Sequence, residues 1–111
     1  MRVASFLLMT ALPGAVALAQ PASTGPGAMR CTVVIGRLSS PSAAERMPVL
    51  SWVQGYLSGI ATARSASDKA PAFEVPEYDA LQPLILTRCK VDPTADLYHV
   101  AGNLPLKSRD R

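Results

Sequence analysis

The chain has 111 residues, 49% of them hydrophobic, with a formal net charge of +3 at pH 7 and a single histidine. A chain of this length forms one small domain with a thin core. Its charges form no basic stripe, which excludes the pattern of a protein that binds nucleic acid. Two cysteines and one histidine are too few for a tetrahedral zinc site, so we expect no metal ion or other cofactor.

The N-terminus has the three-part layout of a secretory signal peptide. Arg2 supplies a positive charge, residues 3–18 are apolar and uncharged, and Ala17-Leu18-Ala19 is a small-x-small cleavage site. The apolar stretch contains a proline and a glycine and is shorter than the ~20 residues that span a membrane. We therefore expect residues 1–19 to be cleaved before Gln20, leaving a periplasmic protein with no membrane span.

Cys31 and Cys89 are the only cysteines, and both remain in the predicted secreted chain. Disulfides persist in an oxidising compartment, so we predict one disulfide between these residues. It would close a loop of about sixty residues, and the lost loop-closure entropy would contribute about 4 kcal/mol. That is a large share of the stability of a small domain.

Residues 20–29 are rich in proline and glycine and are predicted to form a flexible lead-in. Residues 30–38 fit two structures. The β-branched run at residues 32–35 favours a strand, although a lone strand has no partner. The helical spacing i, i+3, i+4 and i+7 joins Cys31, Val34, Ile35 and Leu38. We expect a short helix here.

The next helix has two candidate starts. Ser42-x-x-Glu45 has the spacing of a capping box, which favours a start at Ser42. Pro48 fits better in the first turn of a helix that begins near Met47. Either helix runs to about residue 66. Its apolar face consists of Val49, Val53, Tyr56, Leu57 and Ile60.

A motif in this helix reads SWVQGYLSG, residues 51–59. Trp52 lies four residues before Tyr56, so the two rings are neighbours on one flank. Gly55 and Gly59 are also four apart, and each costs about 1 kcal/mol relative to alanine in a helix. Close approach of another backbone would offset that cost, so we interpret these four residues as a helix-packing motif. Exposed rings would instead indicate a surface that binds a protein partner.

A polar loop over residues 64–75 precedes the third helix. Asp79-x-x-Gln82 repeats the capping spacing, so we expect this helix to start at Asp79, with Pro83 in its first turns. Its predicted buried face consists of Leu81, Leu84, Ile85 and Cys89.

Asp92-Pro93 is a typical helix start, with aspartate as the cap and proline at the first position. Leu97, Val100, Ala101 and Leu104 form the stripe of this last helix, which ends before Pro105. The single domain is thus expected over residues 30–105, followed by a solvated basic tail at residues 106–111. The predicted fold is all-α, a small bundle of three to four short helices joined by one disulfide.

The order of these features resembles a known family. A cysteine near the mature N-terminus, a W-x-x-G-Y-L-S-G helix at residues 52–59 and a C-x-x-x-P segment at residues 89–93 are similar to small periplasmic proteins grouped with the HdeA/HdeB acid-stress chaperones. The resemblance implies a helical domain in which Cys31 and Cys89 match the paired cysteines. The tryptophan motif is not a mark of the classical chaperones, so the chain looks like a side branch.

The resemblance implies an acid-triggered chaperone that binds denaturing protein clients. Below about pH 3 the carboxylates are protonated while the 10 basic side chains that follow residue 19 stay charged. The net charge then rises from +2 towards about +11, counting His99, and self-repulsion loosens the core. The alternative is a protein-binding module. Secreted immunity proteins of the Rap/Tai type also carry a helical Y-x-x-G motif.

We do not expect an enzyme. A Ser-His-Asp triad would have to use His99, which has no flanking motif and is interpreted as a partly exposed structural residue. Ser51 and Ser58 lack a nucleophile elbow. Gly55 and Gly59 follow no predicted strand, so they form no phosphate-binding loop.

Overall fold

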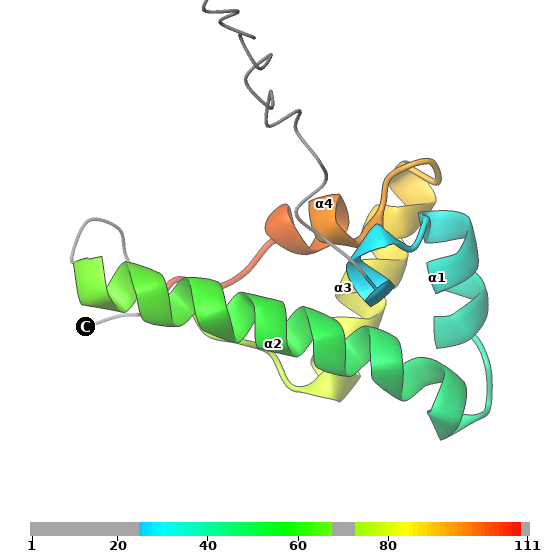
Figure 1. Cartoon of the computed structure of the whole chain (residues 1–111), viewed down its shortest axis with the longest axis horizontal. Helices are drawn as coiled ribbons and strands as arrows, with labels where there is room; N and C mark the ends of the chain where they lie inside the picture. Colours follow the sequence, from blue (N-terminus) through cyan, green and yellow to red (C-terminus); the bar gives the residue numbers. More distant parts are fainter. Residues whose placement is uncertain (1–24, 68–72, 110–111) are drawn as a thin grey trace, which may run out of the picture.

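The structure, a computed structural model, describes residues 25–67 and 73–109. The predicted signal peptide at residues 1–19 lies outside the described residues. Within them the chain is helical and contains no strand, so the all-α prediction is confirmed. Its elements in chain order are the 3-10 helix η1 (Gly25–Ala28) and the α-helices α1 (Cys31–Leu38), α2 (Ala43–Ser67), α3 (Tyr78–Val91) and α4 (Leu97–Gly102) (Figure 1).

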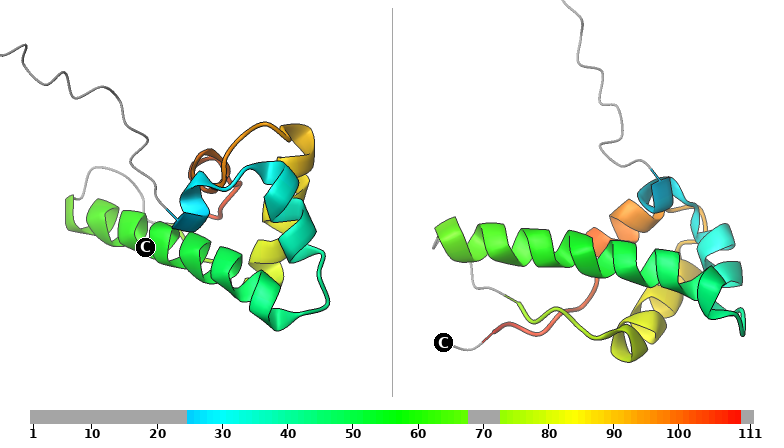
Figure 2. Two further views of the ribbon diagram at one scale, coloured as in Figure 1. Left: turned by 45° about the vertical axis from the view of Figure 1, so that its right-hand side comes forward. Right: turned by 60° about the horizontal axis from the view of Figure 1, so that its bottom comes forward.

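The long helix α2 contacts each of the other three α-helices, and α1, α3 and α4 pack against one side of it (Figure 1). Two further views in Figure 2 show the last turns of α2 extending past the other three helices. No helix within residues 25–67 and 73–109 is long and apolar enough to cross a membrane.

The core lies where the inner faces of the four helices meet. The predicted disulfide between Cys31 and Cys89 is confirmed, and it joins the first residue of α1 to the last turns of α3. Both cysteines are buried. The other core side chains are Val34, Leu38, Val49, Leu50, Val53, Leu57, Leu81, Ile85, Leu97, Val100, Ala101 and Leu104. The four predicted apolar stripes therefore supply nearly all of the core.

Residues 31–38 form a helix, as their helical stripe predicts. The β-branched side chains of Thr32 and Val33 point to solvent, while Val34 and Leu38 are buried against the other helices. Burial of the stripe outweighs the small preference of β-branched residues for strands.

Helix α2 begins at Ala43, directly after Ser42, so the earlier of its two candidate starts is confirmed. The predicted capping box is wrong. The Ser42 N–H donates to the hydroxyl of Ser40 (3.1 Å), and the Glu45 carboxylate faces Arg37 on α1 at 3.7 Å. The glutamate thus pairs across the turn between two helices and does not reach back to its own helix start.

Helix α3 begins at Tyr78, one residue before the predicted start. The Asp79 carboxylate accepts a hydrogen bond from the neighbouring Ala80 N–H (2.9 Å). The Gln82 amide donates to the carbonyl of Leu38 (3.0 Å), which ties α3 to the end of α1. The spacing predicts that Gln82 caps the start of α3, whereas its side chain instead connects α3 to α1.

The predicted helix start at Asp92-Pro93 is wrong. Residues 92–95 form a turn, and α4 begins at Leu97 with Asp96 as its N-cap. The Asp96 carboxylate accepts from the His99 N–H (2.9 Å). Asp96, four residues later, is the cap because the backbone at this position pairs with residues 29–31. This interaction joins segments that are far apart in the sequence.

Two segments continue the fold beyond the helices. Residues 73–75 run beside residues 106–108, and the Glu74 N–H donates to the Lys107 carbonyl (3.0 Å). The Arg64 guanidinium lies 5.6 Å from the centre of the Phe73 ring, which joins the end of α2 to this pair. The chain after the predicted boundary at residue 105 thus packs on the domain as far as residue 108.

Candidate functional site

An aromatic row crosses from α2 to α4, and we define it as Trp52, Tyr56 and Tyr98. The rings of Trp52 and Tyr56 stack at 5.3 Å with an interplanar angle of 6°, so their predicted contact is confirmed. Tyr98 meets Tyr56 edge to face at 5.4 Å. All three side chains are half-buried, so the row is neither a closed core nor a free surface.

The Tyr56 hydroxyl lies at the centre of the aromatic row, where Tyr98 contacts its ring. Burial raises the pKa of the Tyr56 hydroxyl above its ordinary value of 10.0, and hydrogen bonding and charge interaction with Tyr98 raise it further. Tyr56 therefore stays neutral at physiological pH. A partner that contacts the row meets apolar ring faces and tyrosine hydroxyl groups, a composition typical of protein-binding anchors.

Gly55 and Gly59 do not pack against another element of this chain. Both are exposed, and a Cβ atom added at either position meets nothing within 4 Å. The helix-packing interpretation of these glycines is therefore wrong for the described residues. The glycines lie on the solvent side of α2, three positions after each aromatic ring, whereas the core side is filled by Val53 and Leu57.

The glycine that does approach the row is Gly102, at the end of α4. A Cβ added there would lie 3.7 Å from the Tyr56 hydroxyl oxygen. No local pattern identifies this contact, because it depends on how α4 crosses α2.

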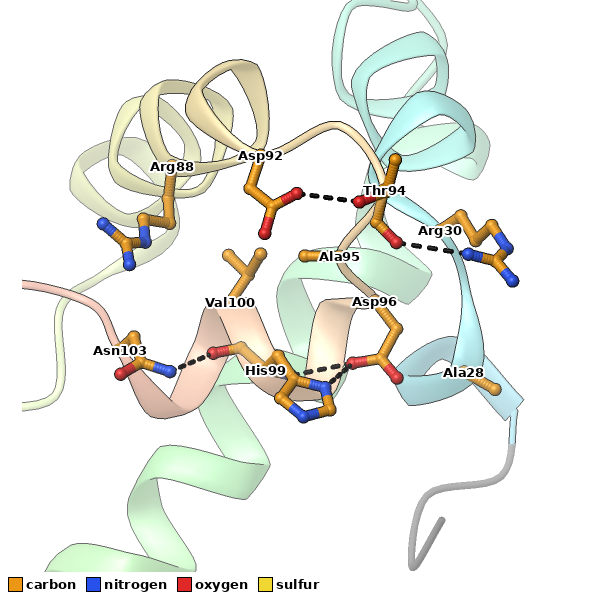
Figure 3. Close-up of a pocket in the computed structure, with 10 residues that line it drawn as sticks. All are labelled: Ala28, Arg30, Arg88, Asp92, Thr94, Ala95, Asp96, His99, Val100 and Asn103. Carbon is orange, nitrogen blue, oxygen red and sulfur yellow. Dashed lines mark hydrogen bonds and ion pairs between the residues drawn. The ribbon is translucent and has the colours of Figure 1, made fainter.

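A second site, which we call the polar pocket, lies between the end of α3, the turn that follows it, α4 and the segment before α1 (Figure 3). Its volume is about 460 Å³. Its titratable lining residues are Arg30, Arg88, Asp92, Asp96 and His99. These residues come from positions up to 69 apart, which is why no sequence motif indicates the pocket.

Most polar groups of the pocket are bonded to each other. Arg30 donates to the Thr94 carbonyl (3.2 Å), and the Thr94 hydroxyl donates to Asp92 Oδ1 (2.9 Å). The Asn103 amide donates to the His99 carbonyl (2.8 Å). Arg88 differs, since its guanidinium makes no hydrogen bond or ion pair with residues 25–67 or 73–109.

Asp96 is the central charge of the pocket. Its Oδ1 lies 2.7 Å from His99 Nδ1. Burial is the largest single influence on the pKa of Asp96 and raises it. The hydrogen bonds from the His99 N–H and ring, together with the charges of His99 and Arg30, outweigh burial and hold the pKa of Asp96 below 3.8. The carboxylate is therefore negatively charged at neutral pH.

Among the described residues that line the pocket, none places a free nucleophile beside the His99–Asp96 pair. The only hydroxyl side chain that lines the pocket belongs to Thr94, which is bonded to Asp92. In the described part of the chain, no three His, Cys, Asp or Glu side chains are placed to hold a metal ion. The arrangement is suited to holding charged groups by hydrogen bonds and ion pairs.

Comparisons of the chain with protein-family models, with curated proteins and with solved structures found no match. The resemblance to the HdeA/HdeB family therefore rests on the residues quoted above and stays a prediction. The structure itself defines the class of fold, a small helical bundle with one buried disulfide.

Proposed function

We propose that this is a secreted, non-enzymatic protein of the acid-stress chaperone type, which binds denaturing protein clients when acid loosens its fold. The observation that carries the proposal is the contact at Asp96 between residues 29–31 and residues 95–97, which we call the joint. There the Cys31 N–H donates to the Ala95 carbonyl (2.8 Å), and the Leu97 N–H donates to the Met29 carbonyl (2.9 Å). Asp96 thus caps α4 at the point where the N-terminal segment meets it.

Acid acts on this joint through its charges. At neutral pH the Asp96 carboxylate faces Arg30 and His99, and Arg88 and Asp92 line the same pocket from the end of α3. As the pH falls through the depressed pKa of Asp96, its carboxylate loses the negative charge that offsets the positive groups around it. The guanidinium groups of Arg30 and Arg88 then share the pocket with less opposing charge, and their repulsion favours release of α4.

Release of α4 would expose apolar surface without dispersing the chain. The inner face of α4 is buried against the other helices, and its members are Leu97, Val100 and Ala101. The Cys31–Cys89 disulfide still joins α1 to α3. The loosened protein would present the inner faces of several helices to a client that is itself denaturing.

Suppression of client aggregation tests the proposal. The oxidised protein is expected to keep a denaturing client soluble at about pH 3 and not at pH 7, and reduction of the disulfide is expected to lower this activity. Asp96→Asn should shift the activity to higher pH because it removes the ion pair. Glu77→Gln, outside the pocket, is the matched control. Full client aggregation at pH 3 would exclude the chaperone function.

A second candidate is a protein-binding module such as a Rap/Tai-type immunity protein. The half-exposed aromatic row beside the open positions 55 and 59 favours it. Gly59→Lys is expected to leave the fold intact, because a side chain there meets open space, and to block a partner that binds this face. Co-expression with secreted toxins of the same genome neighbourhood measures the loss of protection. If the same variant still suppresses client aggregation at about pH 3, the aromatic row is needed neither for binding clients nor for folding.

A further inference from the structure

We propose that the polar pocket binds a small zwitterion that carries one carboxylate and one ammonium group, a free amino acid or a short peptide. The proposal goes beyond the function proposed above and is independent of it, since it concerns the folded protein at neutral pH. It rests on the arrangement of opposite charges around a small apolar floor.

Arg88 and Asn103 form the carboxylate-binding side of the pocket. Figure 3 shows the two side chains on the same side, Arg88 from α3 and Asn103 from the position directly after α4. The Arg88 guanidinium makes no hydrogen bond or ion pair with any described residue, so its planar set of donors is available. A guanidinium of this kind binds a carboxylate through two parallel hydrogen bonds.

Asp92 and Asp96 supply the ammonium-binding groups. The hydrogen bonds of both residues use Oδ1, to Thr94 and to His99 respectively, so Oδ2 of each remains as an acceptor. In Figure 3 Asp96 lies across the pocket from Arg88 and Asn103. An ammonium group in the pocket can donate to either carboxylate, and its positive charge favours the ionised form of both.

The floor between these two sides is apolar and small. Ala95 and Val100 lie between Arg88 and Asp96 (Figure 3). The volume of about 460 Å³ falls within the range of roughly 300–1,000 Å³ that is typical of small-molecule sites. A simple anion would meet two aspartates and a simple cation two arginines, so the charges select a ligand that carries both signs.

Nuclear magnetic resonance titration tests the proposal with three probes. The disulfide-bonded protein is titrated at pH 7 with Ala-Ala, with N-acetylalanine, which lacks the ammonium group, and with alaninamide, which lacks the carboxylate. Ala-Ala is expected to shift the amides of residues 88–103 with a Kd of about 1 mM. Each truncated probe should bind about tenfold more weakly, because it leaves charged groups of the pocket unpaired. A parallel titration with alanine separates a free amino acid from a peptide.

Two variants locate the binding. Arg88→Gln is expected to weaken Ala-Ala binding about tenfold, whereas Lys90→Gln, on the same helix but outside the pocket, should leave it unchanged. Asp92→Asn should weaken Ala-Ala binding and spare N-acetylalanine, which provides a test if Arg88→Gln disturbs the fold. The proposal is overturned if Ala-Ala shifts no amide of residues 88–103, if all probes bind equally, or if both pocket variants bind like the unmodified protein.

Discussion

At the scale of single residues, Asp96 takes part in three interactions at once. It caps α4, pairs with the His99 ring and lies beside the backbone contact between residues 29–31 and 95–97. Because the folded-state pKa lies below 3.8, the carboxylate binds protons more weakly in the folded than in the unfolded chain. Its contribution to stability is therefore complete above the unfolded pKa and is lost as the pH falls through the folded value.

Asp96→Asn separates the charge from the cap. Asparagine also caps helices, so at pH 7 the variant should keep the cap of α4 and lose only the stabilisation that comes from the Asp96 charge. As the pH falls from the unfolded pKa of aspartate, about 3.9, through the lower folded pKa, the free energy of unfolding of the variant should fall less than that of the unmodified protein, because the variant has no carboxylate to protonate at this position. Urea denaturation at several pH values measures both curves. Parallel curves would show that Asp96 does not contribute to acid sensitivity.

Replacement of Gly55 or Gly59 by alanine is expected to stabilise the protein. Both lie inside α2, and a methyl group at either position meets open space. Gly55→Ala and Gly59→Ala should each raise the free energy of unfolding by about 0.5–1 kcal/mol, since alanine restricts the unfolded chain and favours the helix. Thermal or urea denaturation measures the change. Gly25→Ala is the control and should give no gain, because Gly25 has a φ of 64°.

At the scale of elements, the disulfide holds α1 in place. Helix α1 has only eight residues, too few to be stable alone, and its first residue is the buried Cys31. Replacement of both cysteines by alanine should lower the free energy of unfolding by about 2–5 kcal/mol. Urea denaturation of the oxidised protein, the reduced protein and the variant measures this loss. A loss below 1 kcal/mol would mean that packing alone holds α1.

The helices could be predicted from the sequence, and their starts could be predicted only in part. Each apolar stripe fixes which face is buried, because it repeats over several turns of one helix. The starts depend on which polar side chain the folded structure leaves available. Glu45 and Gln82 contact other helices, and Asp96 replaces Asp92 as a cap because of a backbone contact with residues 29–31.

The candidate sites show the same division between local and distant contacts. The stacking of Trp52 and Tyr56 follows from their spacing of four along one helix. Tyr98 joins them only because α4 crosses α2. The open space around Gly55 and Gly59 agrees with the predicted stripe of α2, because both glycines lie opposite Val53 and Leu57. The packing interpretation was wrong because the glycine spacing does not show whether another backbone covers that face.

At the scale of the whole molecule, the disulfide divides the described chain into two parts. Residues 31–89 form a covalently closed ring that contains α1, α2 and most of α3. Helices η1 and α4 lie outside this ring, on either side of it in the sequence, and they contact each other, while the segment that follows η1 pairs with the backbone at Asp96. Their contact therefore depends on hydrogen bonds and packing alone.

This division sets an order of opening that hydrogen exchange can measure. Amides of α4 should exchange through openings of lower free energy than amides of α1 and α3, because α4 can detach while the ring stays folded. Reduction of the disulfide should bring the two groups of amides together. Equal exchange in the oxidised protein would indicate a single cooperative unit. In the expected case, α4 opens locally while the covalent ring of residues 31–89 stays folded. The position of the disulfide then decides which helices can unfold separately from the rest of the domain.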